Sequence, residues 1–172
     1  MHENRILIHK LKNFENINSN FLIITLMLFG SILLAISAKV QVPFWPVPMT
    51  MQTFVIFLIG MTYSVRLSFA TVAFYLFQGA IGLPVFAAGG GVAYLVGPTA
   101  GYLYGMLFAS IVISYLANLG FSKTYFKATV SLLIGSAIIF SFGIIYLGYI
   151  IGFEKAVAAG LLPFIPSELF KI

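Results

Sequence analysis

Cysteine and aspartate are absent from this sequence, and histidine and glutamate are scarce. Without cysteine, the chain can form no disulfide, thiol nucleophile or cysteine-based metal site. Its histidines, His2 and His9, lie in a basic N-terminal segment, so neither a catalytic histidine nor a histidine-based metal site is expected. No phosphate-binding loop of the GxxxxGK[ST] type is present. We therefore expect no ATP hydrolysis by this chain, no bound metal and no cofactor, and an enzyme is the least favoured class.

Charge is also scarce, because only 8% of the 172 residues are charged whereas 61% are hydrophobic. A soluble domain averages roughly 45–50% apolar and about 25% charged residues. A chain this short has too much surface to hide so many apolar side chains in one core, so the sequence predicts a lipid environment. The net charge of +5 comes without a basic stripe of interleaved aromatics. A nucleic-acid partner is therefore not expected.

Long uncharged runs predict an all-α integral membrane protein. A membrane-spanning helix needs about 20 apolar residues, and the runs accommodate five spans and the start of a sixth at Pro166. The five predicted spans are Phe21–Ala38, Thr50–Tyr63, Leu67–Ala80, Pro98–Leu119 and Ala128–Gly152. We expect a basic cytoplasmic segment over residues 1–20 and one transmembrane substrate-binding domain over residues 21–172.

Lysine and arginine are distributed unevenly over the predicted connections. The N-terminal segment and the second and fourth connections hold Arg5, Lys10, Lys12, Arg66, Lys123 and Lys127. The positive-inside rule makes these parts cytoplasmic, with the protein in the cell membrane. The first, third and fifth connections then face outward.

The outward connections have an unusual composition. Residues 82–99 read GLPVFAAGGGVAYLVGPT, and the other two, Lys39–Pro48 and Ala159–Ser167, are also rich in proline, glycine or aromatic residues. Irregular backbone at membrane depth is tolerated only where protein buries it or where it lines a cavity. We therefore expect one outward pocket, although the same residues would also serve merely to turn the chain. Its candidate lining residues are Gly90 and Gly91, for close backbone approach, and Tyr94 and Trp45, for aromatic surface.

Few polar side chains are available to such a pocket. Glu168 and Lys171 share one helical face at the predicted start of the sixth helix. They are either a helix-start signature with a lysine reaching toward water or a pair of ligand anchors. Gln52, at the outer end of the second span, is a further candidate for the pocket.

Small residues recur along the first span, at Ser31, Ala35 and Ala38. Small side chains at helical spacing allow another helix to approach closely. The stripe therefore predicts either packing within the chain or a docking face for a partner subunit.

Several ordered motifs give the chain a strong resemblance to the BioY family, the biotin-capturing membrane subunits, or S components, of energy-coupling factor (ECF) transporters. The resemblance runs from about Ala35 to Lys171. Its motifs are PVPMTMQT at residues 46–53, GLPVFA at 82–87, the glycine-rich bridge, GPTAGY at 97–102 and the stretch from Pro163 to Lys171.

The resemblance implies a six-helix fold, a biotin pocket near the outer face and no enzymatic activity. It also implies that the first helix docks on a transmembrane coupling subunit served by two ATPase subunits. With it, Lys171 is assigned to the valerate carboxylate of biotin and Glu168 to a ureido N–H. The family usually has aspartate at the position of Glu168, so the carboxylate here extends one methylene further.

The sixth helix and the identity of the ligand leave other outcomes open. Members of the family continue through a whole sixth helix, whereas the sequence given reaches only about one turn of it, at Ile172. One turn does not hold helical form by itself. We therefore expect the chain as given to bind biotin weakly or not at all. The alternatives to biotin capture are an S component for a different vitamin and a structural membrane subunit without a ligand, which a ligand-binding panel would separate.

Overall fold

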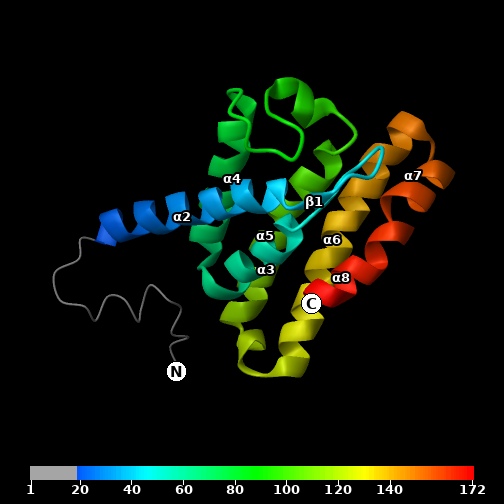
Figure 1. Ribbon diagram of the computed structural model, residues 1–172. Coiled ribbons are helices and arrows are strands. Elements are labelled where there is room, and N and C mark those ends of the chain that lie inside the picture. The colour runs from blue at the N-terminus through cyan, green and yellow to red at the C-terminus, as the bar shows by residue number, and fades with distance from the viewer. Residues whose placement is uncertain (1–18) are drawn as a thin grey trace.

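The computed structural model describes residues 19–172, which are mainly helical (Figure 1). Its α-helices are α2 (Ser19–Lys39), α3 (Gln52–Thr62), α4 (Val65–Ala80), α5 (Ala100–Asn118), α6 (Tyr125–Ile151), α7 (Phe153–Gly160) and α8 (Ile165–Lys171). Short 3-10 helices are η1 (Val92–Val96), η2 (Phe121–Lys123) and η3 (Leu162–Phe164). Strands β1 (Gln41–Val42) and β2 (Met49–Thr50) form an antiparallel hairpin that pairs Gln41 with Thr50. The basic segment predicted for residues 1–20 lies outside the described residues, apart from its end in α2.

Among the described residues, three helices are long and apolar enough to cross a membrane: Asn20–Lys39, Ala100–Asn118 and Tyr125–Ile151. They correspond to the first, fourth and fifth predicted spans. The second and third predicted spans are also helical, but α3 has 11 residues and α4 has 16. Both are shorter than the roughly 20 residues that cross a bilayer at right angles. The sixth helix begins at Ile165, one residue before its predicted start.

Large apolar side chains cover much of the outside of the bundle. Water-soluble proteins rarely expose contiguous apolar surface on this scale, so the exterior is that of a protein surrounded by lipid. Exposed examples on α2 and α6 are Phe21, Ile24, Phe29, Ile32, Ile36, Ile145 and Tyr149.

The centre of the bundle is the pair formed by α5 and α6, which lie side by side (Figure 1). A Cβ atom at Gly105 would stand only 2.8 Å from the Ile139 Cα, so glycine is what permits this close approach. Helices α2, α3 and α4 pack together beside this pair, and α7 packs on α6. The side chains with almost no exposed surface include Leu34, Ile56, Ile113, Ile139 and Leu147.

Successive connections alternate between the two ends of the bundle. The hairpin tip, the connection from α4 to α5 and helix α7 lie at one end, at the top of Figure 1. The turn between α5 and α6, which contains η2, lies at the other end (Figure 1). The three irregular connections therefore share one end, as the sequence predicted.

The small residues of α2 are used for packing within the chain. Ser31 and Ala38 have no exposed surface, and Ala35 is half-buried against the core. The spacing arises because α2 and α4 approach closely at Gly30, where a Cβ atom would stand 2.6 Å from the Thr71 side chain. Ser31 and Ala38 are therefore buried within the chain, which is one of the two roles that the sequence left open for this stripe.

Candidate functional site

A cavity lies against the irregular connections, bordered by α3, α5, α6 and α8. The cavity has a volume of about 40 Å³, within a wider region of about 470 Å³ between atoms that includes space open to the exterior. Each of the three connections contributes to its lining, which confirms that they converge on one pocket. The lining residues are Val47, Pro48, Thr50, Gln52, Thr53, Ala87, Tyr94, Thr99, Tyr102, Leu103, Met106, Ile139, Phe140, Phe164, Glu168 and Lys171.

One wall of the cavity is aromatic. The rings of Tyr102 and Phe164 stack with centroids 6.4 Å apart, and Phe140 meets both of them edge-on. The Tyr102 hydroxyl donates to the Gly160 carbonyl at 2.8 Å, so this ring is fixed at its polar end. Rigid aromatic faces of this kind suit a flat or largely apolar ligand.

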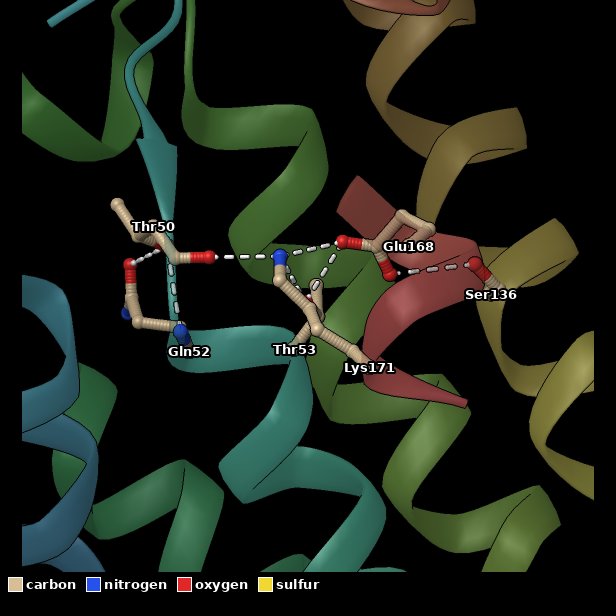
Figure 2. Close-up of polar contacts among 6 residues, drawn as sticks. All are labelled: Thr50, Gln52, Thr53, Ser136, Glu168 and Lys171. Carbon is tan, nitrogen blue, oxygen red and sulfur yellow. Dashed lines mark hydrogen bonds and ion pairs between the residues drawn. The ribbon is translucent and has the colours of Figure 1, made fainter. Parts of the chain in front are cut away.

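The opposite side of the site carries a buried ammonium group. Lys171 Nζ donates to Glu168 Oε1 at 2.6 Å, to Thr53 Oγ1 at 2.9 Å and to the Thr50 carbonyl at 2.8 Å. Figure 2 shows the ammonium group between the Thr50 carbonyl and the Glu168 carboxylate. A lysine ammonium has three N–H donors, so each of them has an acceptor here. The cluster joins α8 to β2 and α3.

The two oxygens of Glu168 differ in their bonding. Oε1 accepts from both Lys171 and the Thr53 hydroxyl, the latter at 2.8 Å. Oε2 accepts a long bond of 3.4 Å from Ser136 on α6 (Figure 2). A carboxylate oxygen accepts more than one hydrogen bond, so Oε2 is the oxygen with capacity for a ligand.

Gln52 lies on the cavity lining, but its amide is engaged within the chain. Nε2 donates to the Tyr75 hydroxyl at 2.8 Å, and Oε1 accepts from the Thr50 hydroxyl at 3.1 Å. The Tyr75 hydroxyl in turn donates to the Val85 carbonyl at 3.0 Å. Gln52 therefore links α3 through α4 to the glycine-rich connection.

Gly90 and Gly91 are absent from the cavity lining. A Cβ atom at Gly90 would overlap the Leu83 carbonyl, so this glycine is needed for close packing within the connection itself. Gly91 has a φ of +100°, which side chains rarely adopt, and its N–H donates to the Gly79 carbonyl at 2.7 Å. The contacts of both glycines are therefore within the chain, to Leu83 and Gly79.

The two aromatic residues predicted to line the pocket, Tyr94 and Trp45, lie in different parts of the structure. Tyr94 lines the cavity and stacks on Phe86 with centroids 4.9 Å apart. Trp45 is 85% exposed at the hairpin tip and borders a separate surface groove with Lys155. The structure thus brings Gln52, Tyr94, Glu168 and Lys171 together and leaves Trp45, Gly90 and Gly91 outside the cavity lining.

Sequence reasoning missed several residues of the site. Thr53 directly follows Gln52 within the PVPMTMQT motif, and Tyr102 closes the GPTAGY motif, so the motifs contained a usable signal. Ser136 is one serine within a 27-residue apolar helix, and its contact depends on how α8 folds back on α6. Among residues 19–172, no group of His, Cys, Asp and Glu could hold a metal ion.

Similarity to known proteins shows the family of this chain. Residues 10–172 match the sequence profile of the BioY family. The chain belongs to the BioY family. It is 37% identical over 156 residues to a probable biotin transporter BioY of Rickettsia prowazekii, covering 90% of this chain and 80% of that protein. It is also 37% identical over 142 residues to the biotin transporter BioY of Thermotoga maritima, covering 81% of this chain and 83% of the relative.

The similarity of the fold to a solved structure supports the same assignment. A crystal structure described as the S-component for biotin from an ECF-type ABC transporter superposes with a TM-score of 0.79 at 25% identity. The match covers 91% of this chain and 87% of that one. The resemblance noted from the motifs is therefore confirmed for the BioY family, and the chain is a multi-pass membrane protein.

Proposed function

We propose that this chain is the biotin-binding membrane subunit of an ECF-type vitamin uptake transporter, and that it is a transport subunit without enzymatic activity. The observation that carries the proposal is the buried Glu168–Lys171 pair beside an aromatic-lined cavity. The relatives named as biotin transporters and the related S-component for biotin support the choice of ligand.

Biotin presents a bicycle, in which a ureido ring with two N–H donors is fused to an apolar sulfur-containing ring, and a carboxylate at the end of an aliphatic chain. The aromatic wall of Tyr102, Phe140 and Phe164 offers contact area for the apolar parts. Glu168 Oε2 has capacity to accept from a ureido N–H. Because Glu168 Oε1 lies 2.6 Å from Lys171 Nζ, one biotin molecule can meet this pair with only one of its two polar ends at a time. Polar anchors of this kind set orientation and specificity in mainly apolar pockets.

We assign Lys171 to the valerate carboxylate, and this assignment requires an exchange of hydrogen bonds. All three ammonium donors already have acceptors within the chain. An incoming carboxylate must therefore replace one of them, and the Thr53 hydroxyl is a replaceable acceptor because it can turn about its own side-chain bond. The affinity of Lys171 for a carboxylate would then depend on whether the Thr53 hydroxyl keeps or releases its hydrogen bond to the ammonium group.

The site is held by tertiary contacts. Although α8 has only 7 residues, its two charged side chains bond to Thr50 in β2, to Thr53 in the first turn of α3 and to Ser136 on α6. The expectation of weak binding assumed a helical turn that stands alone. With these contacts in place, we propose that the chain forms a binding-competent site.

We further propose that the pocket faces outward, that the N-terminus is cytoplasmic, and that a transmembrane coupling subunit with two ATPase subunits completes the transporter. The positive-inside distribution supports the orientation. On α2, the surface open to such a partner carries Ile32 and Ile36, with Ala35 at its edge.

Calorimetric titration of the purified full-length chain tests the proposal and separates the two anchors. Wild-type protein and Lys171→Ala would each be titrated with biotin and with biotin methyl ester. If Lys171 binds the carboxylate, its removal weakens biotin binding by roughly 2–5 kcal/mol but weakens ester binding far less. An absence of saturable biotin binding by the wild type would contradict the proposed function, and equal losses for both ligands would contradict the assignment of Lys171.

A further inference from the structure

Three consecutive backbone carbonyls of the glycine-rich connection, at residues 85–87, accept hydrogen bonds from side chains of three other elements. The Tyr75 hydroxyl of α4 donates to the first at 3.0 Å. The Lys39 ammonium at the end of α2 donates to the second at 2.6 Å, and the Gln41 amide of β1 donates to the third at 3.2 Å. These three side chains, called the clamp below, therefore hold residues 85–87 in place from three other elements.

The clamped segment supports one wall of the cavity. Phe86 has no exposed surface, and its ring packs against Gly79 and meets Tyr75 edge-on with centroids 5.4 Å apart. The same ring stacks beneath Tyr94, which lines the cavity together with Ala87. Any shift of the 85–87 backbone would move these two lining residues.

Lys39 is the member of the clamp that belongs to α2. A lysine in the last turn of a helix is already favoured by the helix dipole. Here its ammonium also reaches a specific carbonyl 47 residues further along the chain, in a short charge-assisted bond. Further toward its N-terminus, α2 is fixed to α3 by the Tyr63 hydroxyl, which donates to the Leu26 carbonyl at 2.9 Å.

We infer that Lys39 is a positioning residue that couples the end of α2 to the cavity wall formed by Ala87 and Tyr94. It touches no ligand and acts through the Phe86 carbonyl. Because energetic coupling between two places is reciprocal, a displacement of α2 that breaks this bond loosens the wall, and a ligand that orders the wall holds the end of α2. The inference concerns the chain alone, and only the biotin titration described below rests on the proposed function.

Hydrogen–deuterium exchange of the ligand-free full-length chain in detergent tests the clamp directly. We compare wild type, Lys39→Met, the rescue variant Lys39→Arg and the control Lys155→Met, whose lysine has no hydrogen bond among the described residues. In Lys39→Met, peptides covering residues 82–94 should exchange at least several times faster, while peptides from α5 and α6 remain unchanged and report an intact fold. Lys39→Arg should restore protection, and Lys155→Met should match wild type. Unchanged exchange over residues 82–94 in Lys39→Met would overturn the inference, as would a lack of rescue by arginine.

Biotin titration of the same four proteins supplies the second arm. The Kd for biotin should rise about tenfold in Lys39→Met and return toward wild type in Lys39→Arg, since one charge-assisted hydrogen bond contributes on that order. An unchanged Kd in Lys39→Met would overturn the coupling. A wild type that binds no biotin contradicts the proposed function instead, while the exchange experiment still decides the role of Lys39.

Discussion

Lys171 Nζ lies 2.6 Å from Glu168 Oε1, and the two side chains expose only 2% and 6% of their surface. At this depth each charge depends on the other, because removing one partner leaves an uncompensated buried charge. The same pair that is proposed to hold the ligand therefore also holds α8 against α3.

We predict that Lys171→Met destabilises the ligand-free chain by about 3 kcal/mol, since it leaves Glu168 buried without its partner. The double variant Lys171→Met/Glu168→Gln should recover part of that loss, because it removes both charges. Thermal unfolding of the purified proteins gives the measurement. The exposed-lysine variant Lys155→Met should stay within about 0.5 kcal/mol of wild type. If Lys171→Met behaved like this control, the pair would contribute nothing to stability.

Thr53 is predicted to control affinity through Lys171 and Glu168. Its hydroxyl donates to Glu168 and accepts from Lys171, where the ligand carboxylate is proposed to replace it. Thr53→Val, which keeps the shape and loses the hydroxyl, leaves one ammonium donor free for the ligand and should strengthen biotin binding by about 1 kcal/mol. Thr53→Ser keeps the hydroxyl and should remain near wild type. Isothermal titration distinguishes the two variants, and weaker biotin binding by Thr53→Val would contradict the proposed exchange of hydrogen bonds.

Replacing Gly90 is predicted to destabilise the fold and to weaken biotin binding through that loss of stability. A Cβ atom there would overlap the Leu83 carbonyl, so Gly90→Ala should lower the thermal unfolding midpoint and weaken biotin binding in parallel. Ala88→Val, at an exposed neighbouring position, is the matched control and should change neither. Loss of binding with an unchanged midpoint would instead show that Gly90 leaves room for the ligand, as the sequence had suggested.

Membrane orientation can be tested because the chain contains no cysteine of its own. Ala158→Cys on α7 and Ser122→Cys in η2 both place a thiol at an exposed position, at opposite ends of the bundle (Figure 1). An impermeant thiol reagent should label Ala158→Cys in intact cells and should reach Ser122→Cys only after lysis. The reverse pattern would invert the proposed topology.

The sequence predicted those parts of the site that depend on short-range pattern. Glu168 and Lys171 were found because their spacing places them on one helical face, and the cavity was anticipated because three irregular connections fell on the same side. The partners Thr53 and Ser136 depend on how α8 packs against α3 and α6, and no local pattern encodes that contact. Likewise, the small residues at Ser31 and Ala38 indicate a close helix contact, and only the folded chain shows that α2 packs on α3 and α4.

Trp45 is the chain's only tryptophan, and it stands almost fully exposed on a hairpin whose residues Val47 and Pro48 face the cavity. The indole emission of the unmodified protein therefore arises from one known position, a few residues from the proposed ligand site. The protein thus carries a built-in optical probe: a change in that emission on adding ligand can be assigned to the hairpin, with no dye attached and no background from other tryptophans.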